Sequence, residues 1–318
     1  MTARIATRRS SLVIGTRGSK LALWQAEWVQ ASLHAIAPDL SVTLRTIKTS
    51  GDKILDVPLA AIGGKGLFVK EIEEALLREE IDLAVHSMKD VPTQLPERLA
   101  ILCIPKRENA HDALISRDAC KLADLPAGAR IGTSSLRRQA QLLHHRPDLR
   151  IQMLRGNLDT RLRKVRDGDY EAIVLAAAGL TRLGWLDEVT EYLPYTISLP
   201  AIGQGAIGIE GRRDDTFAGM LVQKLDHQDT HTAVAAERAL LERLEGGCQV
   251  PIAAHATIQG ETLLMEGLVA SVDGRQVLRE TIEGQATEAE HVGRQLAERL
   301  LARGGQAILS QIYGKGQL

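Results

Sequence analysis

One cysteine and a set of basic residues on turns are the residues of this chain best suited to chemistry. Cys248 follows a pair of glycines after a strongly helical stretch. Arg and Lys residues stand on short turns rich in Gly and Ser, in segments 15–19, 63–66, 134–138 and 154–157. A thiolate is a good nucleophile, and guanidinium groups bind carboxylates through paired, charge-assisted hydrogen bonds. Together these features predict a protein that holds a polyanionic organic chain, with Cys248 available for a covalent bond to it.

Many of the basic residues lie where an expected strand ends and an expected helix begins. Arg17, Arg137 and Arg138 are in such places, where the helix dipole and unpaired N–H groups favour anions. Three more follow the next expected strands: Arg155, Arg161 and Arg182. For any one Arg, a solvated surface charge is the alternative. Phosphate is the competing ligand, but the Gly-x-x-x-x-Gly-Lys-Ser/Thr loop of P-loop nucleotide-binding proteins does not occur in the sequence.

Asp90 is the acidic residue of interest, because it follows an expected strand in the segment 86–92. It could cap the turn before Pro92. Among Arg and Lys residues it would instead stay ionised, and could accept a hydrogen bond from an N–H donor or stabilise a cationic intermediate.

The three cysteines allow several interpretations. Cys103 is in an apolar stretch and Cys120 in a polar one, and we expect no chemical role for either. Cys248 could itself be buried and inert, or could serve a Cys-His hydrolase with His86 or His255 as the base. The irregular spacing of the cysteines argues against a disulfide framework and against a zinc site, so we expect no metal.

Composition limits the class of protein. The 318 residues favour two or three domains, and 44% hydrophobic and 25% charged residues are typical of a globular protein. The formal net charge of −1 lacks the basic excess of a nucleic-acid-binding protein. No apolar run approaches the roughly 20 residues of a membrane span. We therefore expect a cytoplasmic protein that binds neither nucleic acid nor membrane.

Strands and helices are expected to alternate through the first two thirds of the chain. The expected strands are 11–15, 41–49, 81–85, 129–132, 151–154 and 172–176, and the expected helices follow Ser19 and cover 68–78, 135–145 and 158–166. In the first helix, Leu21, Trp24, Trp28 and Ala31 are predicted to form the buried face. This alternation predicts mainly parallel sheets, whose ligands bind beyond the carboxyl ends of the strands.

Two short segments look like copies of each other. Residues 13–16 and 130–133 both run from a strand through Gly-Thr toward a helix, which suggests two related α/β units unless the likeness is chance. Segments 104–106 and 198–205 are candidate hinges between these units. The last part differs: a helix over 230–245, a hairpin turn at Asp273-Gly274 and a closing helix striped by Ala289, Val292, Leu296 and Leu300 predict a small α+β domain.

At several segments the chain closely resembles the porphobilinogen deaminase family, also called hydroxymethylbilane synthases. The segments that carry the resemblance are 16–19, 21–25, 63–68, 84–92, 132–139, 154–157, 203–205 and 246–248. Their order and spacing extend the resemblance from about Leu12 to the last helix. The family often has a Lys where this chain has Ala61, and Lys53 or Lys65 are the candidates to compensate.

The resemblance implies a fold, a cofactor and a reaction. The fold is α/β, with two periplasmic-binding-protein-like α/β domains, 1–105 with 206–222 and 106–205, and a small α+β C-terminal domain, 223–318, that carries Cys248. The cofactor is a dipyrromethane, joined to Cys248 by a thioether. Four porphobilinogen molecules are added head to tail with loss of ammonia, and water releases the linear tetrapyrrole hydroxymethylbilane. The family also points to a monomer.

The resemblance further implies roles for individual residues. Asp90 would contact pyrrole N–H groups and stabilise the positive charge that develops as ammonia leaves. The residues that would guide substrate and the growing chain are Arg17, Arg155, Arg161 and Arg182. Those assigned to cofactor binding are Cys248, Lys89, Ser135, Arg137, Arg138, Ser19, Lys65 and Phe68. Two other readings stay open: a solute-binding protein that closes on a carboxylated ligand without chemistry, and the Cys-dependent hydrolase.

Overall fold

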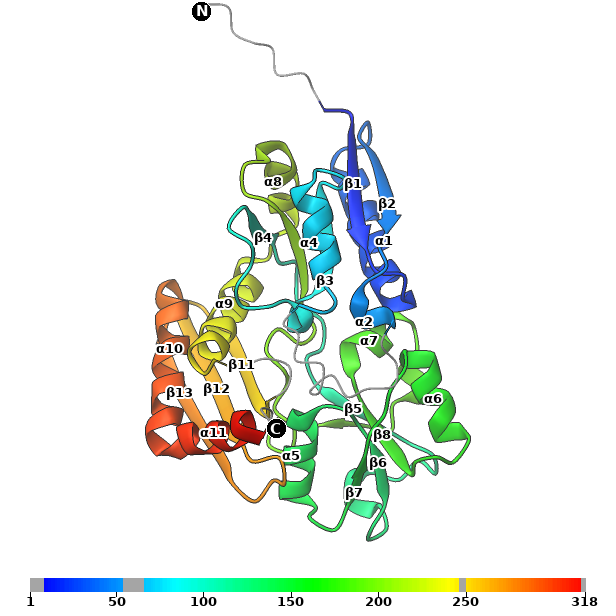
Figure 1. Ribbon diagram of the computed structural model, residues 1–318, viewed down its shortest axis with the longest axis vertical. Helices are drawn as coiled ribbons and strands as arrows, with labels where there is room; N and C mark the ends of the chain where they lie inside the picture. The colour runs from blue at the N-terminus through cyan, green and yellow to red at the C-terminus, as the bar shows by residue number, and fades with distance from the viewer. Residues whose placement is uncertain (1–8, 54–65, 246–249, 316–318) are drawn as a thin grey trace, which may run out of the picture.

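The computed structural model describes residues 9–53, 66–245 and 250–315, which form three separate β-sheets (Figure 1). The first sheet, at the top of Figure 1, has the strand order β2-β1-β3-β10-β4, and the second, at the lower right, has the order β7-β6-β8-β5-β9. The third sheet, at the lower left, has the order β11-β12-β13.

The first lobe is built around the first sheet. Its strands are β1 (Ser11–Thr16), β2 (Ser41–Thr46), β3 (Leu83–Ser87), β4 (Leu99–Cys103) and β10 (Ile207–Arg212). Its helices are α1 (Lys20–Ile36), α2 (Ser50–Lys53), α4 (Lys70–Leu77) and α8 (Thr216–Val222). The return of β10 to this sheet, from beyond the second lobe, makes the first lobe discontinuous in sequence.

The second lobe is built in the same way. Its strands are β5 (Asp112–Ser116), β6 (Arg130–Gly132), β7 (Arg150–Gln152), β8 (Ala172–Ala176) and β9 (Glu191–Leu193). Its helices are α5 (Leu136–His145), α6 (Leu158–Arg166) and α7 (Ala177–Arg182). Helices α1 and α7 bring the two lobes into contact.

Both sheets are mixed, whereas the sequence predicted mainly parallel ones. Strand β1 is parallel to β2 and β3, and β6 is parallel to β7 and β8, as expected. Strands β10 and β5 run antiparallel to their neighbours β3 and β8. The reason is the route of the chain: each of these strands enters its sheet from the crossing between the lobes, at the carboxyl edge, instead of through a helical crossover.

The two segments that looked alike in sequence occupy equivalent places. Strands β1 and β6 each lie between two parallel neighbours, and each contains a glycine against which a bulky side chain packs. A Cβ atom on Gly15 would lie 2.3 Å from Ile81 Cδ1, and one on Gly132 would lie 2.9 Å from Ile173 Cγ2. The same plan in both sheets supports the interpretation of two related units.

The buried face of α1 differs from the prediction. Gln25, Ala26, Val29 and Leu33 are buried, while Trp28 is 38% exposed and Ala31 is exposed. Two apolar stripes with helical spacing share this helix, and periodicity alone could not choose between them. The stripe with the smaller side chains, which contains Ala26, Val29 and Leu33, packs on Leu12 and Ile14 of the sheet.

The third unit is an antiparallel meander with helices packed against it. It contains β11 (Ile252–Gln259), β12 (Thr262–Ala270), β13 (Val277–Gln285), α9 (Gln228–Arg243), α10 (Ala289–Leu300) and α11 (Gln306–Lys315). The predicted hairpin is confirmed, because β12 and β13 form an antiparallel pair on either side of its turn. The predicted apolar stripe of α10 is also confirmed, because Ala289, Val292, Leu296 and Leu300 are all buried. The hairpin turn docks on α5, where His144 Nδ1 lies 2.9 Å from Gly274 O.

The expected fold class is therefore confirmed: two α/β lobes and a small α+β unit. The exact domain limits stay a prediction. Within the described residues, no helix is long and apolar enough to cross a membrane.

Candidate functional site

Three of the predicted residues follow the carboxyl ends of β1 and β3, at the same edge of the first sheet. These strands are parallel neighbours; Arg17 follows β1, and Lys89 and Asp90 follow β3 in the 3₁₀ turn Met88–Asp90. The predicted cap is present, since Ser19 Oγ accepts a hydrogen bond from Ala22 N at the start of α1. Ser19 is thus used by the helix that follows Arg17.

Arg17 and Phe68 form a stacked pair. The Arg17 guanidinium carbon lies 4.2 Å from the centroid of the Phe68 ring, which is within cation–π range. Phe68 in turn fills the space beside Gly51, where a Cβ atom would lie 2.2 Å from the ring. The sequence suggested both residues for the cleft but not their contact.

The first turn of α5 holds a buried ion cluster. Ser135 caps the helix by accepting from Arg138 N at 3.4 Å. Arg137 Nη1 and Arg138 Nη2 both donate to Asp112 at the start of β5, over 2.8 Å and 2.7 Å. Burial alone would raise the pKa of Asp112, but the two guanidinium groups lower it well below its usual range. Asp112 is thus an ionised, fully buried anchor for two predicted cofactor-binding residues.

The sequence did not single out Asp112. Its signal was weak, because an Asp that opens a strand is common at turns. Its meaning depends on Arg137 and Arg138, which lie 25 and 26 residues away in the chain.

Five predicted cations from both lobes form one electrostatic group, called here the cationic cluster: Lys89, Arg137, Arg138, Arg155 and Arg161. Burial lowers the pKa of Lys89; Asp90 and Asp112 oppose this effect, while Arg138 and Arg137 add to it. Burial, followed by repulsion from Arg138 and Arg155, lowers the pKa of Arg161 to about 10, and Asp90 opposes this shift. Within the described residues, the interactions of Lys89 and Arg161 join the five cations to two carboxylates, Asp90 and Asp112, which leaves an excess of positive charge.

Arg182, predicted to guide the substrate, lies beside the second crossing between the lobes. Its Nη2 donates to Gly205 O over 2.6 Å, in the second crossing between the lobes. Burial lowers its pKa to about 10, and Glu108 opposes the shift. Cys248 and Lys65, both predicted for cofactor binding, and Ala61 lie outside the described residues.

Glu237 of α9 ties both lobe crossings to the third unit. This fully buried carboxylate accepts from Arg107 Nη1 at 2.5 Å, Gly203 N at 2.7 Å and Ala256 N at 2.9 Å. Burial alone would raise its pKa, but Arg107 and His255 lower it to about 2. In the sequence, the signal for Glu237 is a charged residue among the apolar positions Ala236 and Leu240 of the same helix, and the prediction did not use it.

The two histidines considered as bases both lie beside buried carboxylates, but of the two only His86 is within hydrogen-bond distance. His86 Nε2 lies 2.9 Å from Glu210 Oε2, and His255 Nδ1 lies 3.6 Å from Glu237 Oε1. Burial raises the pKa of the Cys103 thiol, which disfavours the reactive thiolate form.

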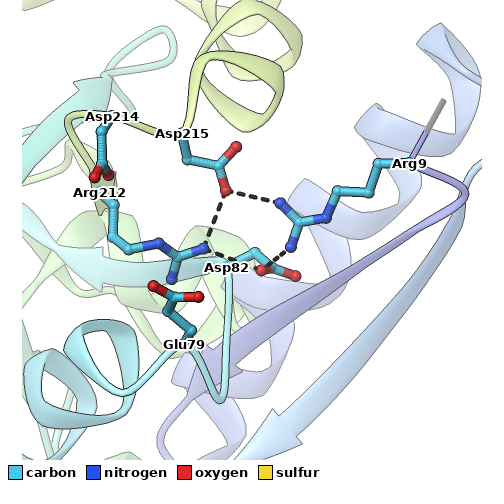
Figure 2. A pocket seen from close by; sticks show the side chains of 6 residues that line it. All are labelled: Arg9, Glu79, Asp82, Arg212, Asp214 and Asp215. Atoms are coloured by element: carbon cyan, nitrogen blue, oxygen red, sulfur yellow. Dashed lines mark hydrogen bonds and ion pairs between the residues drawn. The ribbon is translucent and has the colours of Figure 1, made fainter. Parts of the chain in front are cut away.

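The first lobe has a surface pocket beside the residue that precedes β3 and the residue that ends β10 (Figure 2), whereas Asp90 follows the carboxyl end of β3. Arg9 and Arg212 both pair with Asp82 and Asp215, and Glu79 and Asp214 complete the lining. Four carboxylates against two guanidinium groups would repel a carboxylated ligand. This pocket is therefore a structural ion-pair network and not the candidate site.

Comparison with known proteins identifies the family. One family model, described as the porphobilinogen deaminase dipyromethane cofactor binding domain, matches residues 12–219, and a second, described as the porphobilinogen deaminase C-terminal domain, matches residues 231–302. The chain belongs to the porphobilinogen deaminase family. The first match spans both lobes and therefore contains the whole cationic cluster.

Relatives agree with this assignment along nearly the whole chain. It is 61% identical over 302 residues to porphobilinogen deaminase from Geobacter metallireducens, covering 95% of both chains. It is also 61% identical over 303 residues to the enzyme of the same name from Syntrophotalea carbinolica, covering 95% of this chain and 96% of that one. The solved periplasmic aliphatic sulphonate binding protein SsuA from Escherichia coli is 16% identical, with a TM-score of 0.40 over 74% of this chain and 71% of that chain.

Proposed function

We propose that the protein is a transferase that condenses four porphobilinogen molecules head to tail, with loss of ammonia, into hydroxymethylbilane. The product is built on a dipyrromethane primer joined to Cys248 by a thioether, and hydrolysis releases it. The observation that supports this proposal most is the excess positive charge of the cationic cluster, inside a chain that belongs to the porphobilinogen deaminase family.

The described residues fit the dipyrromethane. Each of its rings carries an acetate and a propionate, so the group is a compact polycarboxylate. Burial is the main cause of the lowered pKa values of Lys89 and Arg161, and repulsion from neighbouring guanidinium groups adds to it. Carboxylates placed among them would relieve that repulsion and accept charge-assisted hydrogen bonds. When bound, the dipyrromethane supplies a ring position to which the first porphobilinogen can be joined.

Two carboxylates of the site have different roles in this proposal. Asp112 accepts hydrogen bonds from Arg137, Arg138 and Ser198, so its role is to fix the two guanidinium groups. Asp90 is the candidate to accept hydrogen bonds from pyrrole N–H groups and to stabilise positive charge as ammonia leaves. Asp90 interacts electrostatically with Lys89 and Arg161, which places it among the cations of the cluster.

The remaining cations would guide the substrate and the growing chain. Arg161 Nε donates to Gly156 O at 2.8 Å, which fixes the side chain against the turn before α6. Arg17 on Phe68 presents a flat cation beside an aromatic ring, a surface suited to an acidic pyrrole. Arg155 and Arg182 complete the proposed path, with Ser19, Ser135 and Lys65 assigned to cofactor binding.

Intact-protein mass spectrometry and a turnover assay test the proposal together. The purified protein should have the mass of the chain plus one dipyrrole, and should release ammonia and form a linear tetrapyrrole from porphobilinogen. Cys248→Ser should lose both the added mass and turnover. Cys120→Ser, which changes a half-buried cysteine far from Cys248 in the sequence, should keep both. A bare polypeptide mass for active protein would refute the covalent primer, and absence of ammonia release would refute the reaction.

Several finer expectations belong to the same proposal. We propose domain limits of 1–105 with 206–222, 106–205 and 223–318, which the membership of strands β10 and β5 in their sheets supports. A monomer in the cytoplasm, without nucleic acid or membrane partners, also stays a prediction. Light scattering on the purified protein tests the oligomeric state.

A further inference from the structure

Arg238 of α9 reaches from the third unit into the segment that follows Asp90. Its guanidinium donates to three consecutive backbone carbonyls: Val91 at 3.1 Å, Pro92 at 2.6 Å and Thr93 at 3.2 Å. Three bonds from one rigid fork fix both the position and the direction of that segment. Burial lowers the pKa of Arg238, and Glu242 and Glu210 oppose the shift.

The other side of the Asp90 turn is held by the same helix face. Val234, one helical turn before Arg238, is fully buried and packs in a cluster with Met88 and Val91. Met88 N also donates to Ala206 O over 3.0 Å, at the start of β10. The residues on both sides of Lys89 and Asp90 are thus fixed by contacts to α9 and to the second lobe crossing.

Helix α9 also connects this turn with two other parts of the proposed machinery. Glu237, the neighbour of Arg238, binds both lobe crossings through Arg107 and Gly203. The helix ends at Arg243, five residues before Cys248 in the sequence. One rigid element therefore contacts the Asp90 turn and the lobe crossings, and leads in sequence to the cysteine.

We infer that Arg238 is a positioning residue, which sets the place of the Asp90 carboxylate relative to the third unit by clamping the carbonyls of residues 91–93. The inference rests on the proposed function, because it assigns Arg238 an effect on catalysis through Asp90. Arg238 itself makes its bonds to the backbone and has no assigned contact with substrate. Misplacing a catalytic group by about 1 Å can lower a rate by about 100-fold.

The first experiment compares Arg238→Met with Arg243→Met on the same helix. Arg243 pairs with Glu298 at 2.6 Å on the surface, where such a pair contributes little. We expect Arg238→Met to keep the dipyrrole mass and to lower kcat about 10- to 100-fold, with KM within about threefold of wild type. Arg243→Met should leave kcat, KM and the mass unchanged. A kcat for Arg238→Met within twofold of wild type, or an equal loss in Arg243→Met, would overturn the inference, as would loss of the dipyrrole.

A second experiment tests whether the effect passes through Asp90. In an Asp90→Glu background the carboxylate is already displaced, so adding Arg238→Met should lower kcat by less than about threefold. The full loss seen in the wild-type background would contradict the inference. If Arg238→Met does not fold, Arg238→Gln and Arg238→Lys are judged by the same kcat, KM and mass criteria. Failure of the wild-type protein to make a tetrapyrrole would instead count against the proposed function, so the two failures are distinguishable.

Discussion

Arg138 donates two hydrogen bonds to the same oxygen of Asp112, from Nε at 3.0 Å and from Nη2 at 2.7 Å, and both residues are buried. Arg137 binds the same carboxylate. One anion thus holds two guanidinium groups whose charges exceed its own. This arrangement explains how a site can keep a fixed surplus of positive charge ready for a carboxylated ligand, since Asp112 offsets only part of the cost of burying Arg137 and Arg138.

Asp112→Asn should destabilise the fold strongly. The change leaves Arg137 and Arg138 buried without their counter-ion, and breaking a buried pair in this way costs about 3–5 kcal/mol. Urea unfolding at pH 7 measures the loss. Asp118→Asn, at an exposed carboxylate that pairs with Arg117, is the matched control and should leave the urea midpoint unchanged. Equal urea midpoints for Asp112→Asn and wild type would show that the Asp112 carboxylate contributes little to the stability of the fold.

Glu237 makes the stability of the fold depend on acid. Its pKa of about 2 in the folded protein lies below the usual 4.5, so its contribution is present above pH 4.5 and is lost as the pH falls toward 2. The difference corresponds to about 3 kcal/mol. We expect Glu237→Gln to be less stable than wild type at pH 7. The difference in their free energies of unfolding should become smaller as the pH falls from about 5 to about 2. A difference that is independent of pH would contradict this assignment.

Much of the scaffold could be predicted from local sequence signals. The caps at Ser19 and Ser135, the hairpin at Gly274 and the stripe of α10 each depend on interactions within a few residues, so the sequence states them directly. The prediction gave the wrong buried face for α1, and it did not include the antiparallel strands β5 and β10. Both depend on which surfaces meet in the fold, and periodicity carries no information about that.

The candidate site shows the same division. Motifs placed Asp90 and the cations at strand ends, and the fold brings many of them into one electrostatic group. Asp112, Glu237 and Arg238 were not predicted, because each has a main partner far away in the chain: Arg137 is 25 residues from Asp112, Arg107 is 130 residues from Glu237 and Val91 is 147 residues from Arg238. Their residue types are common in turns and helices, and only their burial beside a distant opposite charge or carbonyl group shows what they do.

Asp90→Ala tests the proposed catalytic carboxylate. Because Asp90 is placed by backbone contacts of its neighbours, the variant should fold with a near-normal melting temperature and keep its dipyrrole mass. Loss of a preorganised charge partner should lower kcat by about two to three orders of magnitude. Asp118→Ala is the control on an exposed loop and should match wild type. Wild-type turnover in Asp90→Ala would remove Asp90 from the mechanism.

Arg161→Ala tests whether the cationic cluster supports growth of the product chain. Arg161 and Arg163 are both on α6, but Arg161 interacts with Arg138, Arg155 and Asp90, while Arg163 is exposed. Each added pyrrole brings two more carboxylates, so removing one half-buried cation of the cluster should affect later additions more than the first. We therefore expect Arg161→Ala to accumulate protein with one to three added rings, seen as discrete mass increments after a short pulse of porphobilinogen. Arg163→Ala should show the wild-type distribution of masses. If both variants gave that same distribution at the wild-type rate, Arg161 would have no role in elongation, and its low pKa would reflect burial alone.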